Sequence, residues 1–384
     1  MNDNITGIDV DKESDFHGTA GSIIDPWGSS LPESYEKMVK DFGLEVFNKE
    51  LFPNPNRLMR RGVVFAGRDL NVISKCIRGK KPYYVLSGIM PTSENIHFGT
   101  KMVIENIKYF QENGAKETYV LIADLEASAT RGVTLEEARD RALKFHIPAY
   151  IALGLDPKKT KFYFQSQNIR VLQLGYEFAK KITLNEFRAI YGNADPGRIM
   201  AAVAQAGDML LPQLLEKKPI PGIIPVGVDQ DPHLRLARDL MKRFKTKYNF
   251  SPLASIYHKF TPSLDGGEKM SKSKPEGSLE IPEEISSAKK KILKAMSGGR
   301  DTLEEHRKLG AIIEKDMTFE LLKQHLVESD KELNFIYEQY KSGKMTSGEI
   351  KNVACDKISK FMKNFSEQLE IAKKKINGLN FIKF

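Results

Sequence analysis

The sequence has few of the features that mark membrane, secreted or metal-rich proteins. Cys76 and Cys355 are its only cysteines, and two such distant thiols make neither a disulfide framework nor a zinc or iron–sulfur motif. No apolar run approaches the roughly 18 residues that a membrane span requires. The first twenty residues are acidic and polar, unlike the basic and then apolar pattern of a secretory signal. We therefore expect a protein of the reducing cytoplasm, with residues 1–22 as a flexible acidic tail.

The composition is that of an ordinary globular protein with a surplus of positive charge. Of the 384 residues, 41% are apolar and 28% are charged, and this length allows two domains with their own cores. The formal net charge is +9 and the isoelectric point is near 9.1. Such a charge is compatible with a polyanionic partner, which a charge sum alone does not identify. There is no internal repeat or low-complexity segment.

From residue 81 onwards, short apolar runs alternate with amphipathic helical patterns. Strands are expected at residues 82–88, 118–124, 161–165 and 222–228. Helices are expected at residues 102–114 with Gly114 as the C-cap, at 134–153, through about residue 215, and from residue 231. This alternation predicts an α/β fold with a doubly wound, parallel, Rossmann-like sheet, whose ligands bind at the carboxyl ends of its strands.

After residue 275 the strand patterns stop and helical patterns continue. Apolar residues recur every three or four positions from Ile350 to Ile376, which predicts a long amphipathic helix. Residues 351–384 carry eight lysines and three acidic residues, so either a solvated helix face or an RNA-binding face is possible. We predict four segments: the tail 1–22, an N-terminal extension at 23–80 that packs on the catalytic domain, a Rossmann-like catalytic domain at 81–275, and an all-α domain at 276–384.

The first strand-to-helix junction reads SGIMPTSENIHFGTK (residues 87–101). Gly88 ends the strand, and His97 and Gly99 open the next helix. A helix N-terminus offers free N–H groups to a phosphate, Gly99 leaves room for a nucleotide, and His97 adds a side-chain donor. A single His-x-Gly is also frequent by chance, and a lone histidine is often structural.

A second motif follows the α/β body. The stretch LDGGEKMSKSKPEG (residues 264–277) places three lysines between paired glycines and a proline, where no helix or strand is expected. KMSKS (residues 269–273), together with His97-Phe98-Gly99 at the opposite end of the same α/β body, resembles the paired signature of class I aminoacyl-tRNA synthetases. The alternative for KMSKS is a solvated basic loop.

The resemblance implies an ATP-dependent reaction at these motifs. An amino-acid carboxylate attacks the α-phosphorus of ATP in line and pyrophosphate leaves, so positioning and charge stabilisation do the catalysis. Lys269 and Lys272, on either side of Met270 and Ser271, would follow the negative charge onto the pyrophosphate, and Ser271 and Ser273 would donate hydroxyl hydrogen bonds. The preceding glycines would supply the hinge. ATP is then a substrate accompanied by Mg²⁺, with no metal ligated by the protein.

A third element, IPVGVDQDPH (residues 224–233), resembles the Gly-x-Asp element of the same family. Gly227 would let the adenosine lie close to the backbone, and Asp229 would hold the ribose hydroxyls. An acid after a strand is alternatively a cap for the following helix. Gln230 would face the amino acid.

Within the family, the tryptophanyl-tRNA synthetases are the most similar. SGIMPTS and IPVGVDQ look like their bacterial members. Resemblance to the archaeal and eukaryotic members covers DPWG (25–28), LMRRGVVF (58–65), DQDPHLRLARD (229–239) and SGGRDTLEEHR (297–307). KSGKMTSGEIK (341–351) resembles their helical anticodon-binding domain, so the resemblance spans about residues 24–355. It implies L-tryptophan, ATP and tRNA(Trp) as substrates, a homodimer and no membrane.

The residues expected at the amino-acid pocket support tryptophan over tyrosine. Tyrosine enzymes grip the substrate hydroxyl with a tyrosine on the first strand, where this chain has the apolar Leu86. Asp208 resembles the bacterial tryptophan enzymes' acceptor for the indole N–H, Glu126 is a second candidate for that role, and Gln205 would touch the substrate from one helical turn before Asp208. We rank Asp208 first. No insertion of editing-domain size separates the motifs, as expected when the largest amino acid is selected.

Departures and rivals accompany this interpretation. Thr100 stands where many class I enzymes have a second histidine, and Ala201 stands where many relatives carry a tyrosine for the substrate ammonium group; Gln205 and Gln230 are candidates for that group. ADLEA (residues 123–127) departs from the eukaryotic stretch that would support Glu126. The alternatives are a tyrosyl-tRNA synthetase, a small nucleotidyltransferase, and a non-catalytic RNA-binding paralogue. The last should have lost its lysines or Asp229.

Overall fold

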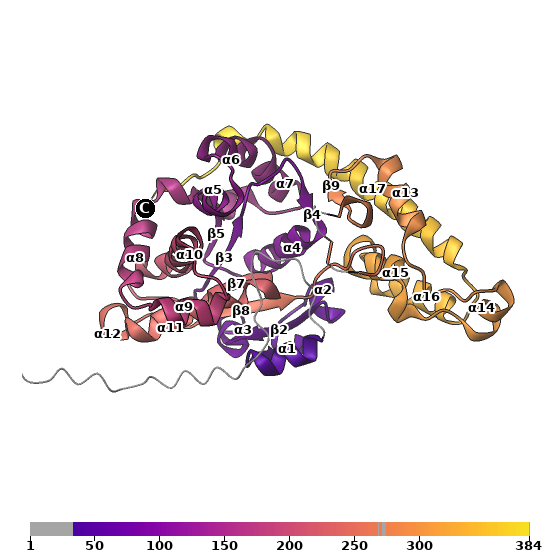
Figure 1. The fold of residues 1–384 in the computed structure, drawn as a ribbon, viewed down its shortest axis with the longest axis horizontal. Coiled ribbons are helices and arrows are strands. Elements are labelled where there is room, and N and C mark those ends of the chain that lie inside the picture. The colour runs from indigo at the N-terminus through magenta and orange to yellow at the C-terminus, as the bar shows by residue number, and fades with distance from the viewer. Residues whose placement is uncertain (1–33, 268, 271–273, 384) are drawn as a thin grey trace, which may run out of the picture.

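The computed structural model describes residues 34–267, 269–270 and 274–383. Its centre is a seven-stranded sheet with the order β1-β2-β8-β7-β3-β5-β6 (Figure 1). The run from β8 to β6 is parallel, whereas β1 and β2 pair antiparallel at one edge. The strands are β1 (Glu45–Val46), β2 (Val64–Arg68), β3 (Tyr84–Ile89), β5 (Glu117–Ile122), β6 (Thr160–Phe164), β7 (Gly222–Gly227) and β8 (Leu253–His258). The expected fold class and all four expected strands are confirmed.

Apolar side chains project from both faces of the central strands, and helices cover the sheet on both sides. In β3, Tyr84 and Leu86 belong to one hydrophobic cluster, while Val85 and Ile89 belong to another. The helices here are α1 (Tyr35–Asp41), α2 (Arg57–Arg60), α3 (Leu70–Arg78), α4 (Phe98–Glu112), α5 (Asp124–Arg131), α6 (Leu135–Arg141), α7 (Ile147–Ala152), α8 (Ile169–Ala179), α9 (Leu184–Tyr191), α10 (Pro196–Leu214), α11 (Asp231–Arg243) and α12 (Lys245–Tyr248). A π-helical turn joins α6 to α7, and Gly114 follows the α4 cap residue Asn113 with a φ of +90°.

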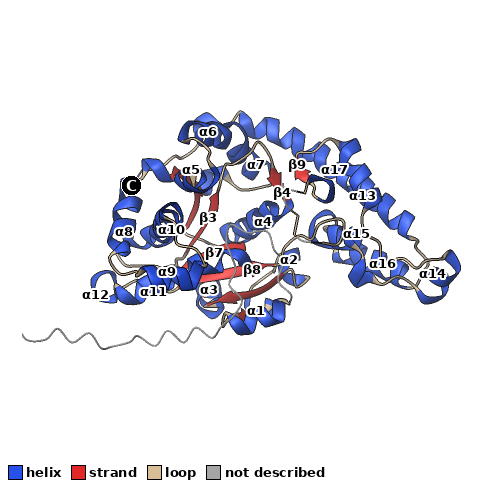
Figure 2. Cartoon of the chain, viewed as in Figure 1, coloured by secondary structure: helices blue, strands red, loops and turns tan. Residues whose placement is uncertain are grey.

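Several strands were not expected from the sequence. All six residues of β8 are buried, so the alternation that signals a half-exposed strand is missing. β1 and β2 add residues of the N-terminal extension to the sheet itself. The short strand β9 (Glu280–Ile281) lies beyond residue 275, where we expected helices alone, and pairs with β4 (Ile96–His97) (Figure 2). Two residues are too few to carry a periodic signal.

The remaining described residues are mainly helical and contact the α/β body. Their helices are α13 (Ile285–Lys294), α14 (Leu303–Leu309), α15 (Met317–Leu321), α16 (Asp330–Lys341) and α17 (Ser347–Lys373). α17 is the long amphipathic helix expected from the sequence, and it packs against both α13 and α7. No helix in the described part of the chain is long and apolar enough to cross a membrane. The segment boundaries given above stay a prediction.

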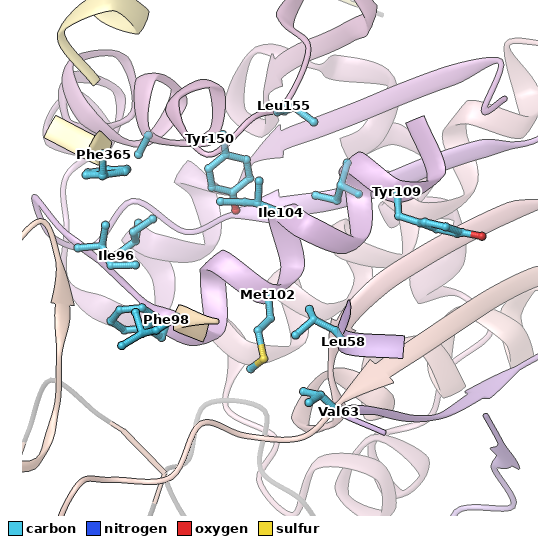
Figure 3. Close-up of a cluster of buried hydrophobic side chains, with 14 of the residues drawn as sticks. Leu58, Val63, Ile96, Phe98, Met102, Ile104, Tyr109, Tyr150, Leu155 and Phe365 are labelled. Carbon is cyan, nitrogen blue, oxygen red and sulfur yellow. The ribbon is translucent and has the colours of Figure 1, made fainter. Parts of the chain in front are cut away.

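One hydrophobic cluster runs from the sheet into the helical part. Phe98 of α4 lies in it together with Phe365 of α17 (Figure 3). The rings of Phe98 and Phe361 are 5.7 Å apart between centroids. Because these side chains share a continuous core, the helical part and the start of α4 are held in a fixed relation.

The residues after α17 return to the free edge of the sheet at β6. The Phe162 amide donates to the Asn380 carbonyl at 3.0 Å, and the Ile382 amide donates to the Phe162 carbonyl at 2.9 Å. The ring of Phe381 stacks on Phe164, with centroids 5.9 Å apart and an interplanar angle of 16°. This C-terminal strap covers a strand edge that would otherwise expose unpaired backbone groups.

We predict that a variant ending at Gly378 is less stable than the full chain by about 1–3 kcal/mol, because two backbone hydrogen bonds and part of an aromatic side chain's burial are lost. Urea unfolding followed by circular dichroism measures the difference. The exposed Lys383→Ala change is the control and should leave the unfolding midpoint unchanged. Equal midpoints for the truncated and full chains would show that the strap contributes nothing.

Candidate active site

A cavity of about 300 Å³ lies at the carboxyl ends of β3 and β7. Its walls come from the start of α4, the ends of the two strands and the segment after β8. Parallel strands present ligand sites at this edge, where the strand order reverses. Nine of the predicted site residues line the cavity: Gly88, His97, Gly99, Glu126, Gly227, Asp229, Gln230, Lys269 and Met270.

His97 and Gly99 form the start of α4. His97 is the N-cap, and its Nδ1 accepts the Thr100 amide hydrogen at 3.3 Å. A Cβ atom on Gly99 would lie 2.8 Å from two atoms of the His97 ring. We expected Gly99 to make room for a nucleotide, and in this structure it also makes room for the imidazole itself. The Thr100 hydroxyl lies 3.4 Å from His97 Nε2, at the position where we noted a missing second histidine.

The predicted ribose and phosphate ligands contact each other across the cavity. Lys269 Nζ lies 3.1 Å from Asp229 Oδ2, and it also lies 4.7 Å from the centre of the Phe260 ring. A Cβ atom on Gly227 would approach Asp229 Oδ1 to 2.6 Å, so a larger residue would force this carboxylate to turn away from its present position. Lys269 is therefore held beside Asp229 and Phe260 at the cavity wall. Ser271, Lys272 and Ser273 lie outside the described residues.

Glu126 and Gln205 meet at the cavity wall. Glu126 lies in the first turn of α5, which begins directly after β5, and only 5% of its surface is exposed. The Gln205 side-chain amide on α10 donates to Glu126 Oε2. A carboxylate with a neighbouring amide at a cavity wall suits a substrate ammonium group.

Asp208 is completely buried and does not line the cavity. Its Oδ1 accepts the Tyr163 hydroxyl at 3.0 Å, and its Oδ2 accepts the Gln165 amide at 2.5 Å. Burial raises the pKa of Asp208 to about 8, and the two hydrogen bonds offset part of that rise. Leu86 is also buried, in the hydrophobic cluster that contains Tyr163. The structure thus separates Asp208 and Leu86 from the open cavity.

Sequence reasoning missed several residues of the cavity wall, among them Tyr150, His258 and Thr261. The Tyr150 hydroxyl donates to the Gly88 carbonyl at 3.1 Å. His258 ends β8, and burial lowers its pKa to about 3, so the ring is neutral. Thr261 follows shortly after. The apolar run LASIYH before the KMSKS stretch was the available signal for β8, and with it for His258.

We predict that the Asp208→Asn change alters the pH dependence of stability. The folded chain keeps a proton on Asp208 that the unfolded chain releases above its ordinary pKa of 3.8, so the parent loses stability as pH rises towards 8. The slope is at most about 1.4 kcal/mol per pH unit, and it vanishes above the folded-state pKa. The stability of Asp208→Asn relative to the parent should therefore rise over this window, as chemical unfolding at several pH values would measure.

Asp330→Asn is the control with the opposite sign. Desolvation raises the pKa of Asp330, but hydrogen bonds from Arg60 and Arg61 outweigh it and the net shift is downward. The difference in the free energy of unfolding between this variant and the parent should shrink as the pH falls into the acid range, because the parent then loses the contribution of the charged Asp330. A flat difference for Asp208→Asn between pH 4 and 8 would contradict the raised pKa.

Comparisons with known proteins show the family to which this chain belongs. The model of class I tRNA synthetases for tryptophan and tyrosine matches residues 78–363. A tryptophan–tRNA ligase of Methanocaldococcus jannaschii is 38% identical over 356 residues, covering 91% of this chain and 95% of the relative. One from Aeropyrum pernix is 39% identical over 366 residues, covering 92% and 96%.

Solved structures agree with these sequence relatives. The crystal structure of tryptophanyl-tRNA synthetase from Aeropyrum pernix superposes with a TM-score of 0.84 and 38% identity, covering 92% of this chain and 98% of that one. A tryptophanyl-tRNA synthetase from Encephalitozoon cuniculi bound to tryptophan gives a TM-score of 0.81 and 27% identity, covering 92% and 99%. The chain belongs to the tryptophanyl-tRNA synthetase family of class I aminoacyl-tRNA synthetases.

Proposed function

We propose that the protein is a tryptophan–tRNA ligase. It activates L-tryptophan with ATP to tryptophanyl-adenylate and pyrophosphate, and then transfers tryptophan to tRNA(Trp). The observation that carries the proposal is that both motifs line the same cavity, with His97 and Gly99 on one side and Lys269 and Met270 on the other. The alternative, a tyrosyl-tRNA synthetase, needs a first-strand hydroxyl to grip the substrate, and this chain has Leu86 there.

In the activation step, the tryptophan carboxylate attacks the α-phosphorus of ATP. The bond between the α-phosphorus and the bridging oxygen breaks, and pyrophosphate leaves with both of its phosphoryl groups. The start of α4 with His97 and the cation of Lys269 stabilise the negative charge that moves onto the leaving group. We propose that Lys272, Ser271 and Ser273 assist, that Asp229 holds the ribose, and that Gly227 admits the adenosine.

On the amino-acid side, we propose separate roles for the two buried acids. Glu126, with Gln205 beside it and Gln230 on the same cavity wall, holds the substrate ammonium group. Asp208, deeper in the fold, accepts the indole N–H after the cluster around Leu86 opens. This division puts the cationic group of tryptophan near the cavity and its apolar ring among Leu86 and its apolar neighbours.

The remaining partners follow from the family. Mg²⁺ would enter with the ATP phosphates, and the described residues contain no group of three or more metal-ligating side chains that could hold it separately. The all-α region with its basic C-terminal helix is proposed to bind the tRNA anticodon, and the enzyme to act in the cytoplasm.

The proposed homodimer has a candidate surface on α8. This helix exposes 59% of Ile169 and 67% of Tyr176 on one face, which a second copy would cover. Sedimentation velocity tests the dimer.

We predict that, of the twenty amino acids, tryptophan alone supports rapid ATP–pyrophosphate exchange. Smaller side chains forfeit apolar burial worth about 25 cal/mol per Å² and leave part of the opened cluster around Leu86 unfilled. The assay measures exchange of labelled pyrophosphate with each amino acid in turn. Exchange with tyrosine at comparable efficiency would refute the tryptophan assignment, and exchange with none would refute the enzymatic one.

The two acids are separable by matched amide variants. Asp208→Asn should weaken tryptophan binding by about 0.5–1.5 kcal/mol, the range for a neutral hydrogen bond, because burial keeps a proton on Asp208 near neutral pH. This is roughly twofold to tenfold in Kd. It should weaken binding of an analogue methylated on the indole nitrogen much less, because that analogue has no N–H to lose. Equilibrium titration of both ligands gives the comparison.

Glu126→Gln should show the complementary pattern. This variant should bind tryptophan much more weakly than the parent does, but it should bind indole-3-propionate, which lacks the amino group, almost as tightly. ATP binding should change little in both variants, since its proposed ligands lie at Gly227 and Asp229. If Glu126→Gln instead abolishes discrimination against the methylated indole while Asp208→Asn does not, the roles of the two acids are reversed.

A further inference from the structure

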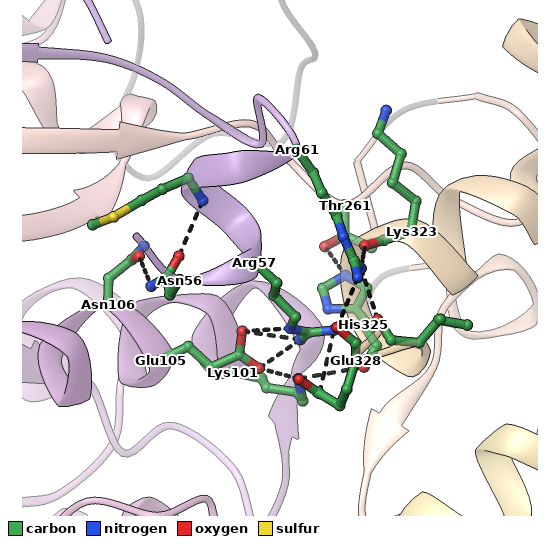
Figure 4. Close-up of polar contacts among 12 residues, drawn as sticks. Asn56, Arg57, Arg61, Lys101, Glu105, Asn106, Thr261, Lys323, His325 and Glu328 are labelled. Carbon is green, nitrogen blue, oxygen red and sulfur yellow. Dashed lines mark hydrogen bonds and ion pairs between the residues drawn. The ribbon is translucent and has the colours of Figure 1, made fainter. Parts of the chain in front are cut away.

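His325 connects the helical part of the chain to both sequence motifs. It lies in the helical turn Leu322–Leu326, between α15 and α16, and only 1% of its surface is exposed. Its ring packs against Phe98, the middle residue of His97-Phe98-Gly99, with centroids 4.7 Å apart. Its Nε2 lies 2.9 Å from the hydroxyl oxygen of Thr261 (Figure 4).

Thr261 in turn supports the KMSKS segment. Its carbonyl accepts the Met270 amide hydrogen at 2.9 Å, and the next residue, Pro262, forms a β-bridge with Lys269. Thr261 also lines the cavity. A shift of the Thr261 side chain therefore moves the backbone that carries Lys269, whose ammonium group reaches Asp229.

The turn that carries His325 is fixed from the other side. Arg61 donates to the carbonyl oxygens of Lys323 and Val327 at 2.7 Å each, and Lys101 Nζ lies 3.5 Å from the His325 carbonyl oxygen (Figure 4). Arg61 follows α2 and Lys101 belongs to α4. The position of the imidazole is thus imposed by the α/β body as well as by its own turn.

Packing alone does not account for a histidine at this position. Burial, together with the nearby Lys101 and Arg57 cations, lowers the pKa of His325, so the ring is neutral. Its Nδ1 is buried without a hydrogen-bond partner, which costs stability that a leucine or phenylalanine would avoid. The imidazole packs an aromatic face on Phe98 and makes a hydrogen bond with Thr261 from the same side chain, and a leucine would lose that hydrogen bond.

We propose that His325 is a positioning residue for the activation step: it holds the start of α4 and the base of the KMSKS segment in register from the helical part of the chain. The inference rests on the proposed function, because it takes these two motifs as the site of the ATP phosphates. His325 itself touches neither substrate. Through it, the helical region acts on the placement of Lys269.

The test combines Thr261→Val, His325→Leu, His325→Gln and the Thr261→Val/His325→Leu double variant. We expect Thr261→Val and His325→Leu each to lower kcat of tryptophan-dependent pyrophosphate exchange roughly fivefold to tenfold, the worth of one hydrogen bond, with KM for ATP and tryptophan unchanged. The double variant should be no slower than either single one, because both remove the same link. His325→Gln keeps a side-chain amide that can hydrogen-bond to Thr261 and should recover most of the rate.

His306→Gln is the matched control. His306 is also buried in the helical part, where its Nε2 lies 2.8 Å from the Met345 carbonyl oxygen, but it contacts neither motif. It should lower the unfolding midpoint and leave kcat unchanged. Additive losses in the double variant, or an equal loss of kcat in His306→Gln, would reduce His325 to a general packing residue.

A second measurement does not depend on activity. Hydrogen exchange of the peptide that contains the Met270 amide should be faster in Thr261→Val and His325→Leu than in the parent and in His306→Gln. If the parent lacked tryptophan-dependent exchange, the proposed function would fail while this measurement still decided the coupling. Unchanged exchange of that amide in both variants would overturn the inference.

Discussion

The parallel pairing of β3 with β7 is the constraint on which the cavity depends. Tyr84 lies opposite Gly222 and Val85 opposite Ile223, so the two strands run in the same direction and end at the same edge of the sheet. β8 continues the pairing beside β7 and ends at His258, directly opposite Gly227. Because these three carboxyl ends meet at one edge, His97, Asp229 and Lys269 line the same cavity although they are far apart in the chain.

The contact between Lys269 and Asp229 balances two opposite charges at the wall of the cavity. Each group satisfies the other, so neither charge faces a half-buried site alone. In the proposed function, a triphosphate, which carries more negative charge than one carboxylate, would draw Lys269 away from Asp229. Asp229 would then be released for neutral hydroxyl donors. The same two side chains thereby serve the ligand-free and the proposed nucleotide-bound arrangement with only a change of partner.

Burial determines the surroundings of Asp208, which we propose as the indole-binding residue. Asp208 lies among apolar side chains with Tyr163 and Gln165 as its hydrogen-bond donors, and its raised pKa is the physical sign of that desolvation. In the proposed function, tryptophan reaches Asp208 only after the cluster around Leu86 opens, so an amino acid that cannot refill this cluster would lose the burial energy. Glu126, at the cavity wall with Gln205, needs no such rearrangement. The proposed sites for the indole ring and for the substrate ammonium group therefore lie at different depths.

The sequence by itself determined the parallel α/β class, the strands β3, β5, β6 and β7, the long helix α17 and the motifs around His97, Asp229 and Lys269, because each carries a local signal of period, turn chemistry or residue type. Only the tertiary structure decided that Glu126 meets Gln205 at the cavity while Asp208 lies behind it, since this depends on how α5 and α10 pack. The same holds for the strap on β6 and for the contacts of His325 with Phe98 and Thr261. In each of these cases the partners are far apart in the chain, and a contact between distant residues leaves no periodic trace in either segment.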